Sequence, residues 1–244
     1  MSGRHAIITG GGTGIGRAIA LALRDAGAEV TITGRRGAIL REVPGCTPVV
    51  MDVADERSVI DGVKAARDAN GPVDICVANA GVAEGASLAR TDAAMWRRIM
   101  AINLDGCYHI TRACLPDMTE WGRVIAVSSI AGLKGLKGAA AYTASKHGMI
   151  GLMRGLAADH LGRGVTFNAL CPGYVDTDIV TDNTARIMAR TGMSEADARN
   201  IMVGQNPHHR LVDAEEVAGA ALYLCSDAAR SVNGQAIQIA GGEF

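Results

Sequence analysis

The feature that most constrains the fold is a glycine-rich turn between a short apolar segment and a helix at the start of the chain. His5 to Thr9 is predicted to form a buried strand, residues 10–16 read GGGTGIG, and a helix is predicted from about Ile15 to Ala26. Glycines in such a turn let the backbone approach a pyrophosphate, whose charge the N–H groups and dipole at the helix start then stabilise. The spacing is GxxxGxG rather than GxGxxG, but the order strand, turn, helix indicates a dinucleotide site rather than an ordinary loop.

Apolar strand-like segments alternate with helical segments along the rest of the chain. Strands are predicted near residues 4–9, 29–33, 47–51, 73–78, 122–128, 164–170 and 235–239. Helices are predicted near residues 15–26, 55–69, 92–118, 141–161 and 214–225. Continuous apolar runs at the strand centres are typical of parallel strands covered on both faces. We therefore predict an α/β fold in one domain over residues 1–244, a single Rossmann-type doubly wound parallel sheet of about seven strands with helices on both faces.

Three polar side chains in the middle of the chain have the spacing of an acid–base site. Tyr142 and Lys146 are four residues apart in a predicted helix, and Ser129 lies thirteen residues before Tyr142. Residues i and i+4 share one helical face, and a neighbouring cation is expected to lower the pKa of a phenol from roughly 10 toward the range useful for general acid–base catalysis. Ser129 ends a predicted strand, where it can bond the substrate oxygen that Tyr142 protonates or deprotonates. An isolated Tyr–Lys pair with this spacing is more often an ordinary surface pair, so the choice between a surface pair and an acid–base site depends on the other motifs.

Those motifs appear in the order known from one enzyme family. They are Thr9-Gly10-x-x-x-Gly14-Ile-Gly16, Asp52-Val53, Asn79-Ala80-Gly81, Asn103, Ser129, Tyr142, Lys146 and Pro172-Gly173-Tyr174-Val175-Asp176-Thr177. With them the chain resembles, from about Arg4 to Gly242, the short-chain dehydrogenase/reductase family. The resemblance implies an NAD(P)-dependent oxidoreductase that interconverts a secondary alcohol and its ketone by hydride transfer. The alcohol would be a 3-hydroxyacyl compound or a similar apolar alcohol.

The resemblance also implies residue roles. The catalytic residues would be Asn103, Ser129, Tyr142 and Lys146, with Tyr142 as general acid/base and Asn103 holding a water in a proton relay to Lys146. Lys146 would also bond the nicotinamide ribose. The cofactor-binding residues would be Gly10, Thr13, Gly14, Ile15, Gly16, Arg35, Asp52, Val53, Asn79, Ala80, Gly81, Tyr142, Lys146, Pro172, Gly173, Val175 and Thr177.

The end of the second predicted strand bears on the choice of nicotinamide cofactor. NAD-preferring Rossmann domains usually carry a carboxylate there that bonds the ribose 2′-hydroxyl. This chain has Gly34 followed by Arg35 and Arg36, and a guanidinium matches the oxygens of a 2′-phosphate. Thr13, however, occupies a loop position where many NADP-using relatives carry a second basic residue. The sequence slightly favours NADP(H) over NAD(H), and two solvated arginines beside an NAD site stay open as the alternative.

The segment from Asp178 to about Gln205 corresponds to the family's variable substrate lid. Its apolar residues predict an amphipathic two-helix flap over a mostly apolar pocket; they are Ile179, Val180, Ile187, Met188, Met193, Ile201 and Met202. Between Ser129 and Tyr142 the only charged residues are Lys134 and Lys137, which argues against a small, doubly charged substrate. We therefore expect a small-molecule alcohol or ketone.

Basic residues near the lid leave a coenzyme A or carrier thioester as a candidate substrate, although solvated surface charges are the alternative explanation. These residues are Arg186, Arg190, His208, His209 and Arg210.

Composition narrows the partners and the location. A net charge of −1 argues against nucleic acid or an anionic membrane as a partner. No apolar run approaches the roughly 18 residues of a membrane span, and the start has no signal-peptide pattern. The six cysteines show no CxxC pairing, and no HExxH-type motif indicates a metal, which fits a reducing, cytoplasmic setting.

Two helices are expected to be apolar on more than one face, which indicates a partner surface. Their apolar residues are Trp96, Ile99, Ile102, Tyr108 and Ile110 in the first, and Met149, Leu152, Met153 and Leu156 in the second. The resemblance implies that these helices pair between subunits in dimers or tetramers, and we predict a homotetramer. Two other functions stay open. One is a catalytically silent cofactor-sensing regulator on the same fold, which retention of Tyr142 and Lys146 disfavours. The other is an epimerase or dehydratase of the extended branch, which the chain length and the GxxxGxG loop disfavour.

Overall fold

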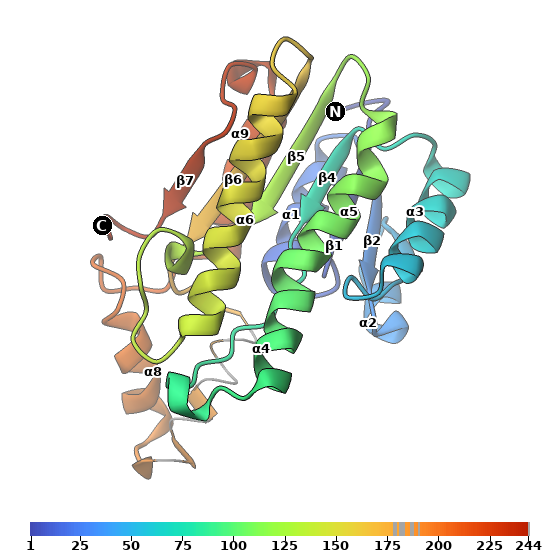
Figure 1. The fold of residues 1–244 in the computed structure, drawn as a ribbon. Coiled ribbons are helices and arrows are strands. Elements are labelled where there is room, and N and C mark those ends of the chain that lie inside the picture. The colour runs from blue at the N-terminus through green and yellow to red at the C-terminus, as the bar shows by residue number, and fades with distance from the viewer. Residues whose placement is uncertain (178–179, 181–183, 186–187, 190, 244) are drawn as a thin grey trace.

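One parallel β-sheet with helices on both faces forms the body of the protein (Figure 1). The computed structural model describes residues 1–177, 180, 184–185, 188–189 and 191–243. The sheet has seven strands in the order β3-β2-β1-β4-β5-β6-β7, and every neighbouring pair is parallel. The strands are β1 (His5–Thr9), β2 (Glu29–Gly34), β3 (Thr47–Val50), β4 (Ile75–Ala78), β5 (Gly122–Val127), β6 (Val165–Pro172) and β7 (Ala236–Ile239). The predicted fold class and all seven predicted strands are confirmed.

The described helices follow the strands in alternation. They are α1 (Gly14–Asp25), α2 (Gly37–Arg41), α3 (Glu56–Asn70), α4 (Ala93–Met100), α5 (Gly106–Cys114), α6 (Ala140–Asp159), α8 (Glu195–Val203) and α9 (Ala214–Cys225). A π-helical turn, η2 (Ala101–Asp105), joins α4 to α5. Short 3₁₀ turns are η1 (Leu88–Arg90), η3 (Leu115–Asp117), η4 (Ile130–Gly132) and η5 (Asp227–Ala229). Within the described residues, no helix has both the length and the apolar character needed to cross a membrane.

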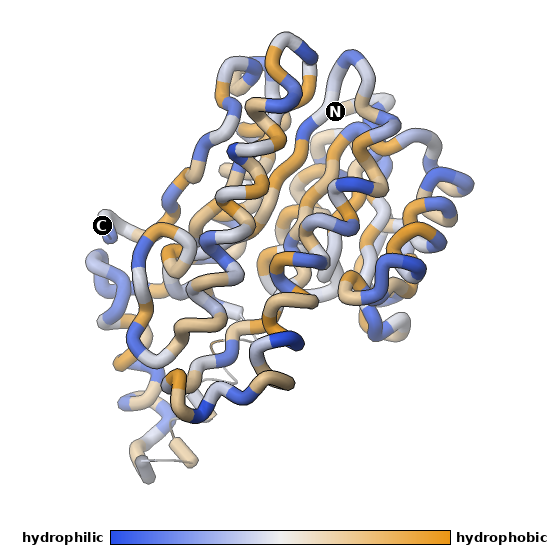
Figure 2. The backbone as a smooth tube through the Cα atoms, in the orientation of Figure 1, coloured by the Kyte–Doolittle hydropathy of each residue, from blue (hydrophilic) through white to orange (hydrophobic). Residues whose placement is uncertain are grey.

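The hydrophobic core has two halves, one on each face of the sheet. Successive residues of a strand point to opposite faces, so Ile8 packs with α1 and α9 while its neighbour Ile7 packs with α3, α5 and α6. Figure 2 shows hydrophobic residues along the strands and hydrophilic residues on the outer side of α3. Because both faces are covered, the central strands are almost fully buried, as their continuous apolar sequences predicted.

Two local features depart from the sequence prediction. The helix expected over residues 92–118 is divided into α4, η2, α5 and η3. The five-residue helix α2 was not expected, because so short a segment shows no helical period. Of the predicted lid, Asp178, Ile179, Arg186, Ile187 and Arg190 lie outside the described residues, whereas α8 forms its second half.

The strand order places a functional crevice at a defined edge of the sheet. Strand β1 pairs with β2 on one side and with β4 on the other, so the chain reverses its winding direction there. In open parallel sheets, the crevice outside the carboxyl ends of the strands at such a point is where ligands bind. The glycine-rich turn follows β1 at this position.

Candidate active site

A cavity of about 850 Å³ opens at the carboxyl ends of the strands. One part, here called the glycine-loop end, is lined by residues 10 and 12–15, 33–36 and 51–53. The other part, here called the lid end, is lined by residues 82–85 and 136–139, Tyr174 and Val180. Ser129, Tyr142 and Lys146 also line the cavity, as do residues 79–81, 172–173, 175 and 177. Sequence-distant motifs are thus brought to one crevice.

The glycine-rich turn exposes its backbone to the cavity because side chains would not fit there. Gly10 has a φ of +65°, and a Cβ on it would lie 2.9 Å from Nδ2 of Asn79. A Cβ on Gly16 would lie 2.4 Å from the carbonyl oxygen of Gly10, so Gly16 does not line the cavity but lets α1 pack closely on the turn. Since α1 begins at Gly14, its first N–H groups lie beside the cavity. This cradle fits the pyrophosphate of a dinucleotide.

A hydrogen-bonded network joins the turn to the end of β4. The Thr9 hydroxyl accepts hydrogen bonds from the backbone N–H groups of Asn79 and Ala80, both at 2.9 Å. The Asn79 amide donates to the carbonyl oxygens of Thr9 at 2.9 Å and of Gly10 at 3.3 Å. Asn79 therefore fixes the separation between two parallel strands at the floor of the cavity.

Two arginines occupy the glycine-loop end beyond β2. Gly34, Arg35 and Arg36 all line the cavity, and both arginines are exposed. In the part of the chain that the structure describes, neither guanidinium has an ion pair or side-chain hydrogen bond. Asp52 lies nearby, where its side chain accepts a hydrogen bond from the N–H of Ala54 at 3.0 Å. The site thus offers free positive charge where the sequence lacks the usual carboxylate.

The predicted acid–base residues lie on two adjoining elements. Tyr142 and Lys146 are on α6, and Ser129 comes directly before η4 at the end of β5. The Lys146 side chain is 4% exposed, and its Nζ donates to the carbonyl oxygen of Val127 at 2.9 Å. Nζ is 5.8 Å from the centroid of the Tyr142 ring. The Ser129 Oγ accepts from the N–H of Ala131 at 3.1 Å. The structure therefore brings these three residues to the same cavity.

The electrostatics of the pair differ from the prediction. Burial raises the pKa of Tyr142 above its ordinary value, a hydrogen bond with Ser129 partly opposes this, and Tyr174 adds to the rise. Burial lowers the pKa of Lys146 to about 8. The lowered pKa predicted for Tyr142 is not found in this structure, because desolvation is the largest cause of its shift and Lys146 is not among the causes. Tyr142 is therefore a neutral proton donor at neutral pH.

Asn103 is completely buried in the π-helical turn η2 and does not line the cavity. Its Oδ1 accepts from the N–H of Val82 at 2.8 Å, and its Nδ2 donates to the carbonyl oxygen of Val82 and to Oγ of Ser145, both at 3.0 Å. A Cβ on Gly81 would lie 3.2 Å from Asn103 Oδ1 and 3.6 Å from Lys146 Nζ. Asn103 thus fixes the 81–82 segment beside Lys146. Single-turn π-helices are frequent at functional sites.

The segment after β6 closes the cavity from the lid side. A Cβ on Gly14 would lie 3.1 Å from Cγ2 of Thr177, so this segment contacts the glycine-rich turn. Asp176 forms an ion pair with Arg199 of α8, with 2.6 Å between their charged atoms. Val180, Met202 and Leu211 form a small hydrophobic cluster separate from the main core. The described part of the predicted lid therefore packs beside the site.

The arginines considered for a carrier thioester and the two lysines between Ser129 and Tyr142 lie in different environments. Arg210 forms a bidentate ion pair with Glu216, with N–O distances of 2.5 and 2.9 Å. Lys134 is paired with Glu243, whereas Lys137 lines the cavity and, within the described ranges, has no ion pair. Arg186 and Arg190 lie outside the described residues. Of these cations, Lys137 is the one with access to the cavity and no partner in the described chain.

Several cavity residues were missed by the sequence analysis. Gly12, Ile39, Leu40 and Met51 line the glycine-loop end, and Glu84 lines the lid end. Tyr174 and Lys137, which the sequence analysis named without giving them a site role, also line the lid end. Ile39 and Leu40 lie on α2, which has no sequence signal, but Gly12 belongs to a recognised turn and could have been included. Among the described residues, no group of His, Cys, Asp and Glu side chains is arranged to hold a metal ion.

Comparisons with known proteins agree with this geometry. A family model described as enoyl-(acyl carrier protein) reductase matches residues 10–243. The chain is 34% identical to an acetoacetyl-CoA reductase of Rhizobium meliloti, with 99% of this chain and 98% of the relative covered. It is 33% identical to a 3-oxoacyl-[acyl-carrier-protein] reductase of Escherichia coli, again covering 99% and 98%. A crystal structure of an actinorhodin polyketide ketoreductase variant with NADPH superposes with a TM-score of 0.94, at 29% identity and with 99% and 98% covered.

Proposed function

Because this chain belongs to the short-chain dehydrogenase/reductase family and is an oxidoreductase of CH–OH and keto groups, we propose that it interconverts a 3-oxoacyl compound and its 3-hydroxy form. The observation that carries this proposal is the meeting of Tyr142, Ser129 and Lys146 at one cavity that also contains the glycine-rich cradle. A coenzyme A or carrier thioester of the acyl group is the substrate form that the named activities of the relatives support.

The chain's own residues supply proton transfer and placement. A bound nicotinamide would supply the hydride. In reduction, the neutral Tyr142 hydroxyl donates its proton to the substrate oxygen as the alkoxide forms, and Ser129 donates a hydrogen bond to the same oxygen. In oxidation the same proton moves back to the Tyr142 oxygen. The buried Lys146 ammonium, with a pKa of about 8, is still mostly protonated at neutral pH and stabilises the phenolate left after proton transfer.

Asn103 has a positioning role in this proposal. Both donors of its side-chain amide are used by Val82 and Ser145, so it holds the backbone beside Lys146 in place. Its expected role in a proton relay through water stays a prediction.

We propose that NADP(H) is the preferred cofactor. The support is Arg35 at the cavity wall, whose guanidinium has no ion pair among the described residues, and the glycine at position 34 in place of a carboxylate that would accept from a ribose hydroxyl. The cofactor would contact the glycine-rich turn, residues 52–53 and 79–81, Lys146 and residues 172–177.

The test of the activity is a turnover assay with both reduced nicotinamides. We expect the purified protein to consume NADPH with acetoacetyl-CoA and with ethyl acetoacetate, and not with crotonyl-CoA, which has a double bond but no ketone. Turnover of crotonyl-CoA alone would indicate an enoyl reductase. Binding of nicotinamide without turnover of any ketone or alcohol would indicate a cofactor-sensing regulator, and either result would contradict the proposal.

We also propose that the chain is one catalytic domain with a lid at about 178–205 and that it assembles as a homotetramer in the cytoplasm. The assembly is supported by Trp96 and Tyr108, which are 41% and 43% exposed on α4 and α5. The location is supported by six free cysteines. Light scattering at low concentration that gives the mass of one 25.2 kDa chain would contradict the assembly.

A further inference from the structure

We propose that the hydroxyl of Tyr174 hydrogen-bonds the second oxygen of the substrate, the acyl oxygen two carbons from the reacting ketone, and so selects 3-oxoacyl compounds over simple ketones. The inference rests on the proposed function and deepens it. Tyr174 lines the lid end of the same cavity as Tyr142 and Ser129. The two phenols are close enough for Tyr174 to contribute to the electrostatics of Tyr142.

The backbone of Tyr174 is fixed by a buried clamp. Its N–H donates to Oδ1 of Asn206 at 3.0 Å, and its carbonyl oxygen accepts from Nδ2 of Asn206 and from the N–H of Val212, both at 2.9 Å. Asn206 is 1% exposed. A Cβ on Gly173 would lie 2.5 Å from Asn206 Oδ1, so the preceding glycine leaves room for the clamp. The backbone position of Tyr174 is therefore set by the fold.

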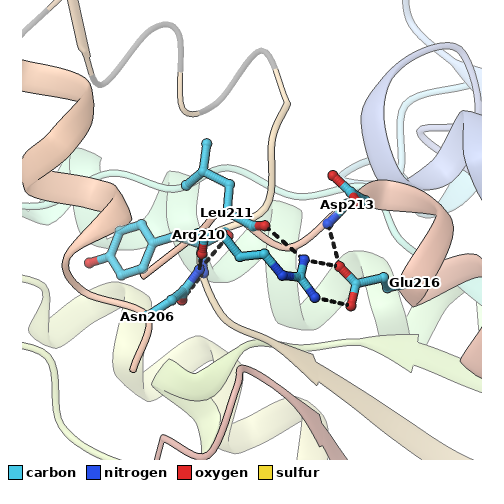
Figure 3. Close-up of polar contacts among 6 residues, drawn as sticks. Asn206, Arg210, Leu211, Asp213 and Glu216 are labelled. Carbon is cyan, nitrogen blue, oxygen red and sulfur yellow. Dashed lines mark hydrogen bonds and ion pairs between the residues drawn. The ribbon is translucent and has the colours of Figure 1, made fainter. Parts of the chain in front are cut away.

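The clamp is itself attached to the start of α9. Asn206 Nδ2 also donates to the carbonyl oxygen of Arg210 at 2.8 Å, and the Arg210 guanidinium pairs with Glu216 (Figure 3). Glu216 in turn accepts from the N–H of Asp213 at 2.8 Å within the capping box of α9 (Figure 3). Arg210 thus serves to hold this corner together, which accounts for a cation that the sequence left open as a ligand for phosphate.

The ring of Tyr174 is supported, but its hydroxyl is free. The ring packs against the cluster of Val180, Met202 and Leu211. Across the described part of the chain, the hydroxyl has no hydrogen-bond partner, and it is not among the fully buried unpaired atoms. Burial raises the pKa of Tyr174, so the group is a neutral donor at neutral pH. A half-buried donor on a residue that lines the cavity, with no partner among the described residues, is available to a ligand.

The rest of the lid end supplies few competing donors. Tyr142 and Ser129 act on the reacting oxygen, and Glu84 is paired with Arg98 at 2.6 Å. Lys137 also lines this end, with its side chain exposed to solvent, and the remaining described wall is apolar or glycine: Val82, Ala83, Gly85, Leu136, Gly138, Ala139 and Val180. A second substrate oxygen placed against such a wall would lose its hydrogen bonds to water without compensation. Tyr174 provides that compensation by donating a hydrogen bond to the second oxygen. A ketone with one oxygen cannot accept this hydrogen bond.

The test compares two substrates of similar size in the Tyr174→Phe variant, which keeps the ring. Ethyl acetoacetate carries the second oxygen, and 2-hexanone lacks it. We expect kcat/KM for ethyl acetoacetate to fall about 3–10-fold, mainly through KM, which is the effect of one lost hydrogen bond. The kinetics of 2-hexanone, followed as a substrate or as a competitive inhibitor, and the Kd of NADPH should change less than about twofold.

Tyr223→Phe is the matched control, because Tyr223 is 46% exposed on α9 and does not line the cavity. It should leave both substrates unchanged. An equal loss with both substrates in Tyr174→Phe would show a general packing role, and no loss with ethyl acetoacetate would show an idle hydroxyl. Either result overturns this inference while the proposed function stands. Failure of the wild-type protein to reduce any ketone would instead overturn the proposed function and this inference with it.

Discussion

The two ends of the cavity are built by different means. At the glycine-loop end the wall is mainly backbone, placed by the ends of β1, β2 and β4 and joined by the hydrogen bonds of Thr9 and Asn79. At the lid end the wall comes from three separate segments, held by a small cluster and by surface ion pairs such as Arg199–Asp176. Backbone in a parallel sheet leaves little freedom, whereas surface ion pairs contribute about 0–1 kcal/mol each. The first end is suited to one constant ligand and the second to a variable one.

The largest expected effect lies where the two ends meet. Tyr142→Phe removes the proton donor and keeps the ring, so kcat should fall roughly 10²–10⁴-fold while NADPH affinity changes little. Single-turnover kinetics and a fluorescence titration of NADPH measure the two quantities separately. If Tyr142→Phe kept near-normal turnover, the proton would come from another group, and the reaction would not be centred on Tyr142 between the two ends of the cavity.

The next effect belongs to the glycine-loop end. Arg35→Ala should weaken NADPH binding about tenfold to a hundredfold through loss of a charge-assisted contact, with little change for NADH, which has no 2′-phosphate. Gly34→Asp should act in the opposite sense, since a carboxylate there accepts from a ribose hydroxyl and repels a phosphate. The ratio of kcat/KM for the two cofactors in the wild type and both variants is the measurement. A strong wild-type preference for NADH together with a silent Arg35→Ala would refute the NADP(H) proposal.

The rigidity of the glycine-loop end can be tested with one methyl group. Gly16→Ala places a Cβ 2.4 Å from the Gly10 carbonyl oxygen, so the turn must shift and the protein should lose about 1–3 kcal/mol of unfolding free energy, together with cofactor affinity. Gly219→Ala is the control, because a Cβ on that residue of α9 meets nothing within 4 Å. The free energy of unfolding of both variants, measured in urea, tests this prediction. Equal stability of the two would show that the turn yields easily and that the glycine-loop end is not rigid.

The same difference explains what the sequence could and could not predict. Gly10 and Gly16 act through close backbone approaches that only glycine permits, and Asn79 acts through its side-chain amide within a recognised motif, so the sequence pattern could be recognised. The strands were found from apolar runs alone. Glu84 reaches the cavity through the path of a loop, and nothing in its local sequence marks it. Tyr174 and Lys137 lie in segments that the sequence analysis named, but their sequence does not show that they line the cavity. The pKa of Tyr142 was also mispredicted, because helical spacing gives the distance to Lys146 but not the burial that dominates.

The smallest expected effect is at the lid end and concerns Lys137. Lys137 lines the cavity without an ion pair in the described chain, but its side chain is exposed, so water screens its charge. We expect Lys137→Ala to raise KM for the anion acetoacetate about two- to fivefold, and to leave KM for the uncharged ethyl acetoacetate and for NADPH unchanged.

Lys134→Ala is the matched control for this last change. Lys134 lies three residues earlier, is paired with Glu243 and does not line the cavity, so its loss should not alter KM for acetoacetate. Raising the salt concentration should reduce the effect of Lys137→Ala, since exposed charges are screened over about 10 Å at 0.1 M salt. The two variants should have separate effects. Arg35→Ala should change only the binding of the cofactor, and Lys137→Ala should change only KM for the anionic substrate. An effect of Lys137→Ala on NADPH, or one equal for acetoacetate and its ester, would show that the two ends of the cavity are not independent.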